Sequence, residues 1–162
     1  MARVGRHVSE TPATALLRSL GVAFTEHVYG YVERGGTAES ARQLGVAENS
    51  VIKTLVMQDE HAAPLIVLMH GDRQVNTQAL ARAIGRKSVQ PCTPEAAQRH
   101  SGYRVGGTSP FGTRKAMPVF VEASVLALPS ILLNGGRRGY LLGLAPTVLT
   151  QQLAAQPVQC AL

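Results

Sequence analysis

The fold is decided by residues 51–70, which read VIKTLVMQDEHAAPLIVLMH. This stretch contains two runs of β-branched and apolar residues, at 51–58 and 65–70, on either side of a polar turn at 59–61. Apolar runs of this length that are bounded by turn residues are typical of β-strands. We therefore expect two strands joined by a turn.

The segments on both sides of this pair alternate between short helices and strands. Capping residues, prolines and terminal glycines predict helices at residues 13–20, 37–44, 76–84 and 146–153, and another short helix opening at Thr93. Further strands are expected at residues 24–31, 119–122, 131–133 and 140–144. No repeat and no linker divides the chain. The sequence therefore predicts one domain of the mixed α/β (α+β) class.

The composition is that of an ordinary globular domain. The chain has 162 residues, of which 45% are hydrophobic and 16% charged. No apolar run approaches the roughly 18 residues of a membrane helix, and residues 1–10 lack the apolar centre of a signal peptide. The scarcity of aromatic residues argues against an RNA-stacking surface of the RNA-recognition-motif type. We expect a cytoplasmic protein without a membrane segment.

Charge is distributed unevenly along the chain. The formal net charge is +6, but residues 1–72 carry −2 and residues 73–162 carry +8, with Glu95 and Glu122 the only acids of the second part. Such asymmetry indicates a polyanionic partner, and nucleic acid is the first candidate. The alternative is a solvated basic surface without a partner.

Cysteine and histidine usage argues against a cofactor. Cys92 and Cys160 are far apart in the sequence, so free thiols are expected, with a disulfide as the alternative. The five histidines form no H-E-x-x-H motif and no pair at metal-ligand spacing. We expect no metal and no other cofactor.

Lys53 stands out within the first predicted strand. Alternation places it on one face with apolar neighbours on both sides, Val51 and Leu55. A lysine in this position either guards an edge strand against aggregation or faces a pocket. In a pocket it would hold a phosphate or a terminal ribose, or act as a base with a lowered pKa.

A glycine-rich loop, residues 105–110, is the second candidate feature. Gly106 and Gly107 would let backbone N–H groups approach a ligand that a Cβ would block, although a tight turn between strands is the plainer interpretation. The sequence does not continue with the Lys-Ser/Thr of a P-loop. Ser109 is not in a G-x-S-x-G elbow, because Phe111 replaces the last glycine. We therefore do not expect Ser109 to be a nucleophile.

Five motifs in order resemble one family. They are Thr11-Pro12-Ala13, His27-x-Tyr29, Val51-x-Lys53-Thr54-Leu55, Ser101-Gly102-Tyr103-x-Val105-Gly106-Gly107-x-Ser109-Pro110 and Gly135-Gly136-Arg137-Arg138-Gly139. Together they resemble the YbaK/EbsC family, relatives of the editing domain of prolyl-tRNA synthetase, over residues 11–154. The resemblance implies a mixed, barrel-like sheet surrounded by short helices. It places the domain at residues 11–156, between a loose leader at 1–10 and a tail at 157–162.

The same resemblance implies an activity and a set of site residues. The activity is removal of cysteine from mischarged Cys-tRNA(Pro), with tRNA as partner, prolyl-tRNA synthetase as a further candidate partner and no cofactor. The implied catalytic residues are Lys53, Gly106 and Gly107. Substrate binding is implied for Tyr29, Thr108, Ser109, Pro110, Asn134, Gly135 and Gly136. Arg137 and Arg138 would contact tRNA or be solvated.

Two positions depart from the family pattern and keep alternatives open. Asn134 stands where relatives usually have Ser, and Leu141 stands where they often have Asp. Without a Ser/His/Asp set, we expect cleavage of the aminoacyl ester assisted by the substrate itself. The alternatives are a deacylase for alanine or serine on tRNA(Pro), and a non-catalytic tRNA-binding module that associates with a synthetase.

Overall fold

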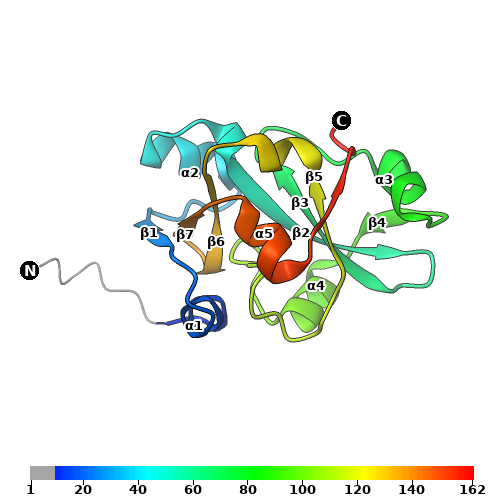
Figure 1. Cartoon of the computed structure of the whole chain (residues 1–162), viewed down its shortest axis with the longest axis horizontal. Coiled ribbons are helices and arrows are strands. Elements are labelled where there is room, and N and C mark those ends of the chain that lie inside the picture. Colours follow the sequence, from blue (N-terminus) through cyan, green and yellow to red (C-terminus); the bar gives the residue numbers. More distant parts are fainter. Residues whose placement is uncertain (1–9) are drawn as a thin grey trace, which may run out of the picture.

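A computed structural model describes residues 10–162, which form an eight-stranded mixed sheet with five α-helices (Figure 1). The helices are α1 (Pro12–Ser19), α2 (Gly36–Leu44), α3 (Thr77–Ile84), α4 (Pro94–Ser101) and α5 (Thr147–Leu153). The strands are β1 (Thr25–Val28), β2 (Val51–Asp59), β3 (Pro64–His70), β4 (Val89–Pro91), β5 (Val119–Glu122), β6 (Ile131–Arg137), β7 (Tyr140–Leu144) and β8 (Gln156–Val158). Short 3-10 turns η2 and η3 span Glu48–Ser50 and Ala123–Ala127. The mixed α/β fold expected from the sequence is confirmed.

Local capping explains why the helices begin and end where they do. The hydroxyl of Thr11 accepts a hydrogen bond from the Thr14 N–H in a capping box. The side chains of Asn76 and Thr93 accept from N–H groups in the first turns of α3 and α4. Gly45 ends α2 and Gly85 ends α3 in the left-handed conformation. These boundaries agree with the sequence prediction to within one residue.

The strand that carries Lys53 lies inside the sheet. The strand order is β1-β7-β6-β2-β3-β5-β8, with β4 also paired to β2. Antiparallel pairing with β3 runs along β2 from Ile52 to Gln58. On its other side β2 pairs with β6 at residues 51–52 and with β4 at residues 57–59. β2 is therefore an interior strand, not the edge strand considered from the sequence, but between these two pairings no strand of the described chain covers residues 53–56.

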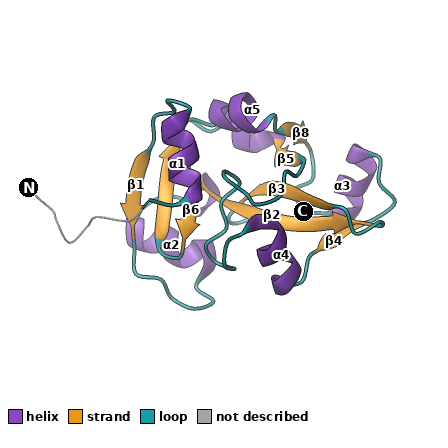
Figure 2. Cartoon of the chain, turned by 90° about the horizontal axis from the view of Figure 1, so that it is seen from below, coloured by secondary structure: helices purple, strands orange, loops and turns teal. Residues whose placement is uncertain are grey.

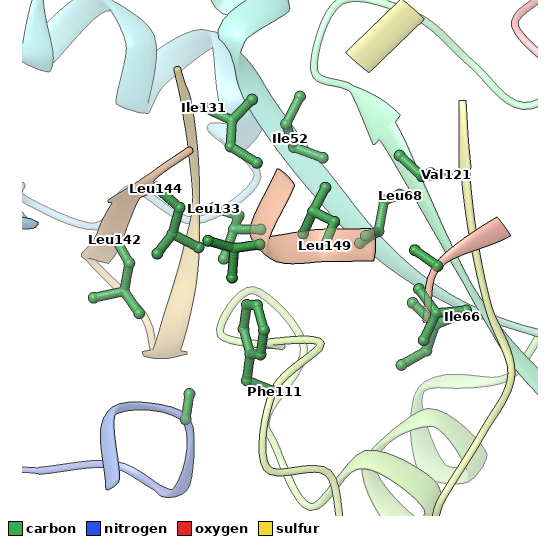
Figure 3. Packing of buried hydrophobic residues seen from close by; sticks show 14 of the residues in the cluster. Ile52, Ile66, Leu68, Phe111, Val121, Ile131, Leu133, Leu142, Leu144 and Leu149 are labelled. Atoms are coloured by element: carbon green, nitrogen blue, oxygen red, sulfur yellow. The ribbon is translucent and has the colours of Figure 1, made fainter. Parts of the chain in front are cut away.

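Helices cover both faces of the sheet. The larger core cluster packs α1 and α5 against one face, where Leu149 and Phe111 meet Ile52, Leu68 and Leu133 (Figure 3). On the opposite face, α3 packs Leu80 against β2 and β3, and α2 packs Ala41 against β2, β6 and β7. Figure 2 shows α1 and α5 on one side of the sheet and α2 on the other. Lys53 projects on the α2 and α3 face, between the two smaller clusters.

The structure also differs from the sequence prediction at several points. β1 is shorter than the expected strand at 24–31, and β6 extends to Arg137 through a register shift that begins at Asn134. β4 and β8 were not expected, because three residues carry too little periodicity to indicate a strand.

The packed structure continues beyond the domain boundary placed at residue 156. β8 pairs with β5, and Cys160 is 1% exposed. The carbonyl of Cys160 accepts a hydrogen bond from the Asn76 N–H at 2.7 Å. Both cysteines are free, as expected. Of the leader placed at residues 1–10, only Glu10 falls within the described residues.

Candidate active site

A cavity of about 740 Å³ opens on the face of the sheet that α2 and α3 cover. Its volume falls within the range of about 300–1,000 Å³ that is typical of small-ligand sites. The uncovered stretch of β2 contributes to its wall, together with residues of α2 and of the glycine loop. Six of the predicted site residues line it: Tyr29, Lys53, Gly106, Thr108, Asn134 and Arg138. The structure therefore brings together segments more than one hundred residues apart in the chain.

Lys53 is half-buried in this wall. Its ammonium donates a hydrogen bond to the carbonyl of Arg73 at 2.5 Å. Burial lowers the pKa of Lys53 from its ordinary value, against the opposing attraction of Glu48 and Asp72. A partly desolvated cation that faces a cavity is suited to bind an anionic or polar ligand group.

The glycine loop, residues 105–110, is attached to the β6–β7 hairpin by two side chains. Asn134 Nδ2 donates to the carbonyl of Gly106 at 3.2 Å, and Arg138 Nε donates to the carbonyl of Val105 at 2.9 Å. The Gly107 N–H closes a turn onto the Arg104 carbonyl at 2.8 Å. Within residues 10–162 the N–H groups of Gly106 and Thr108 have no such partner. Of the three N–H groups, that of Gly107 is therefore the one engaged within the loop, and Gly106 and Thr108 both line the cavity.

Close packing explains why glycines occupy positions 106 and 107. Gly106 has φ +89°, and a Cβ there would lie 2.8 Å from the hydroxyl of Tyr31. A Cβ on Gly107 would lie 2.9 Å from the backbone nitrogen of Arg138. The glycine pair therefore lets the loop pack on the hairpin.

Several residues predicted for the site lie outside the cavity lining. Ser109 is fully buried and its Oγ accepts a hydrogen bond from the Phe111 N–H at 3.2 Å, and Pro110 is buried beside it. Ser109 and Pro110 are therefore packed inside the protein and do not line the cavity. Arg137 lies at the surface and is not part of the lining.

The second glycine pair packs the hairpin against the start of α1. A Cβ on Gly135 would lie 2.7 Å from the ring of Tyr140, and one on Gly136 would lie 3.0 Å from Thr11. The hydroxyl of Thr11 donates to the Gly135 carbonyl at 2.6 Å. In this structure Gly135 and Gly136 support the site and do not line it.

The two positions that depart from the family pattern have defined surroundings. Asn134 Oδ1 accepts from the N–H groups of Gly136 at 2.7 Å and Arg137 at 3.0 Å, while its Nδ2 reaches the glycine loop. A serine hydroxyl is too short to bridge both segments in this way. Leu141 is 4% exposed, packs with Ala41 of α2 and forms an apolar part of the cavity wall.

Tyr31 lines the cavity but was not predicted from the sequence. The guanidinium carbon of Arg138 lies 4.8 Å from the centre of its ring, in a cation–π arrangement, and Tyr31 lines the cavity. Its only sequence signal was its position two residues after Tyr29. Arg138 is thus oriented by an aromatic ring and by a carbonyl.

No activated nucleophile is evident around the cavity within residues 10–162. Burial raises the pKa of Cys92, which lines the cavity, so its thiol stays protonated at neutral pH. Both ring nitrogens of His70 are occupied, by the Asn49 carbonyl and by Ser124 Oγ, each at 2.7 Å. The described residues contain no cluster suited to hold a metal ion and no helix able to cross a membrane.

Comparison with known proteins gives a consistent result. Residues 33–151 match the family model described as the aminoacyl-tRNA editing domain. EbsC of Enterococcus faecalis, provisionally named a Cys-tRNA(Pro)/Cys-tRNA(Cys) deacylase, is 28% identical over 141 residues, which are 86% of each chain. The proline–tRNA ligase of Thermodesulfovibrio yellowstonii is 29% identical over 117 residues. That match covers 72% of this chain but 20% of the ligase.

Solved structures agree in fold. One, described provisionally as a trans-editing enzyme for prolyl tRNA synthetase, superposes with a TM-score of 0.81 at 20% identity and covers 95% of this chain and 99% of that one. The hypothetical protein APE2540 gives 0.86 at 22% identity, with 94% and 100% covered. At this level of identity the likeness shows the fold.

Proposed function

The chain belongs to the aminoacyl-tRNA editing domain family, and from that premise we propose that it is a deacylase that removes cysteine from mischarged Cys-tRNA(Pro). The observation that supports this most is that Lys53, Gly106 and Thr108 line the same cavity. An aminoacyl ester is already activated. The enzyme must therefore hold it, stabilise the developing oxyanion and exclude larger amino acids.

Each residue has a distinct task in this proposal. Lys53 fixes the 3′-terminal adenosine, which orients the ester. The N–H groups of Gly106 and Thr108 donate to the oxyanion, and each such donor contributes about 3 kcal/mol to transition-state stabilisation. Tyr29 lines the pocket for the amino acid, and Arg138 lies at its rim.

The bond-making step is assisted by the substrate. The cysteine thiol loses its proton to the ribose oxygen, and its sulfur attacks the carbonyl carbon of its own ester. The S–C bond forms, the ester C–O bond breaks and the ribose leaves as a hydroxyl. Water then opens the cyclic thioester to free cysteine. No side-chain nucleophile is required, in agreement with the protonated thiol of Cys92.

The proposal is tested by a deacylation panel of Cys-, Ala-, Ser- and Pro-tRNA(Pro), with and without prolyl-tRNA synthetase. We expect the wild-type protein to release cysteine fastest, and Lys53→Ala and Gly106→Ala to abolish release. Lys87→Ala is the control for loss of a lysine. Gly85→Ala is the control for an alanine at positive φ, because a Cβ there meets nothing within 4 Å.

Other outcomes would redirect the assignment. Preferential release of alanine or serine would assign another small amino acid. Tight tRNA binding without any release would indicate a binding module. Unchanged rates in both Lys53→Ala and Gly106→Ala would contradict the assignment of the site.

A further inference from the structure

Four exposed cations gather on α4 and on the segment that follows it, and we call them the α4 basic patch: Arg99, Arg104, Arg114 and Lys115. Two backbone hydrogen bonds hold this segment beside the helix end. The Arg114 N–H donates to the Ser101 carbonyl at 3.0 Å, and the Lys115 N–H donates to the His100 carbonyl at 2.9 Å. Residues 15 apart in the sequence are thereby brought side by side.

These cations are not neutralised within the described chain. The ion pairs of residues 10–162 engage Arg18, Arg42, His61 and Arg86 instead. Burial lowers the pKa of His100, and the charges of Lys115 and Arg99 act on it in the same direction. The end of α4 therefore carries a positive field, which attracts a polyanion.

The α4 basic patch adjoins the cavity. Ala97 of α4 lines the cavity, and so do Val105 and Gly106, which directly follow Arg104. The Val105 N–H donates to Gln98 Oε1 at 3.3 Å, which ties the glycine loop to α4. Arg138, which also lines the cavity, donates to the carbonyl of Val105, and Arg104 directly precedes Val105, so cations connect the cavity lining to the end of α4.

We propose that the α4 basic patch binds the phosphate backbone of the tRNA acceptor stem while the aminoacylated 3′ end occupies the cavity. Phosphates along one side of an A-form stem present a row of negative charges, and four unpaired cations that start at the cavity rim complement such a row. Few aromatic side chains accompany them, so the contact is to the backbone and not to stacked bases. This inference rests on the proposed function, which identifies tRNA as the polyanion and its aminoacylated 3′ end as the group in the cavity.

The test compares two double charge reversals of equal size. Arg99→Glu with Lys115→Glu alters the patch, and Arg82→Glu with Lys87→Glu alters two exposed cations at the end of α3 and just beyond it. Binding of uncharged tRNA(Pro) is measured by fluorescence anisotropy over a range of salt concentrations, and thermal unfolding checks the fold. Deacylation is measured on Cys-tRNA(Pro) and on the cysteinyl ester of adenosine, which lacks the stem.

We expect the patch variant to bind tRNA at least about tenfold more weakly and to lower the log–log salt slope by about 1–2, whereas the α3 variant stays near wild type. Release from Cys-tRNA(Pro) should fall with binding, while release from the adenosine ester stays unchanged. Equal losses in both variants, or none in the patch variant, would overturn the proposal. Absence of deacylation by the wild type would overturn the proposed function and leave the binding comparison to decide this inference.

Discussion

Replacing Lys53 with methionine separates its part in activity from its part in stability. The side chain of methionine keeps the apolar stem that packs beside Val51 and Leu55 but removes the ammonium. The change also removes the hydrogen bond to the Arg73 carbonyl. All other contacts around the cavity remain, so any loss of rate reports on the charge.

Two opposing effects set the stability of this variant. Loss of a charged hydrogen bond destabilises the fold by about 1.5–3 kcal/mol. Against this, burial lowers the pKa of Lys53, so the folded state binds the proton less tightly than the unfolded state does. The charged form of Lys53 is therefore unfavourable in the folded state at neutral pH. Because the two effects oppose each other, we expect a net loss smaller than the hydrogen bond alone would cause, and so a fall in Tm of less than about 10 °C for a chain of this length.

The effect on activity should be much larger. A charged contact to the substrate that orients the ester contributes about 3 kcal/mol, so its loss lowers kcat/KM by about two orders of magnitude. The assay is single-turnover release of labelled cysteine from Cys-tRNA(Pro), corrected for spontaneous hydrolysis, with Lys87→Met as the matched control. A rate within threefold of wild type would refute the anchoring role. A fall in Tm of more than about 10 °C would show that Lys53 acts through folding.

Three further outcomes are expected. Asn134→Ala should lower the free energy of unfolding in urea by about 1–3 kcal/mol, because it releases the glycine loop from the hairpin, and a smaller loss in Asn134→Asp would identify the accepting bonds as the main contribution. Glu122→Gln should destabilise the fold at pH 7, and this penalty should shrink as pH falls through the lowered pKa of Glu122. Burial raises that pKa, but the hydrogen bonds from Cys160, Ser124 and Ala161 together lower it, so the carboxylate stabilises the fold above its ordinary pKa and this contribution is lost as pH falls through the lowered one. An equal gap in Tm at pH 7 and pH 3.5 would contradict this linkage. Cys92→Ser should retain the deacylation rate within about threefold, and an inactive, folded Cys92→Ser would require a nucleophilic mechanism.

The apolar runs at 51–58 and 65–70, the caps at Thr11 and Asn76, and the stop at Gly85 were predictable from the sequence. These features depend on neighbours within a few residues, where propensity and hydrogen bonding are local. The family resemblance likewise depended only on motif order, and the comparison with known proteins confirms it.

Features that depend on distant partners were not predictable. The strands at Val89–Pro91 and Gln156–Val158 exist because neighbours in the sheet supply their hydrogen bonds, not because their own residues form a pattern. Likewise, the role of Tyr31 depends on the position of Arg138, more than one hundred residues away.

The sequence by itself determined the class of fold, the family and the segments that matter. Only the tertiary structure decided what each residue in those segments does. It placed Lys53 at the uncovered stretch of an interior strand and engaged the N–H group of Gly107 in a turn within the loop. It turned Ser109 and Gly135 away from the cavity. The physical reason is that a motif fixes which residue types are adjacent in the chain, whereas exposure, hydrogen-bond partners and pKa are fixed by atoms that other segments bring into contact.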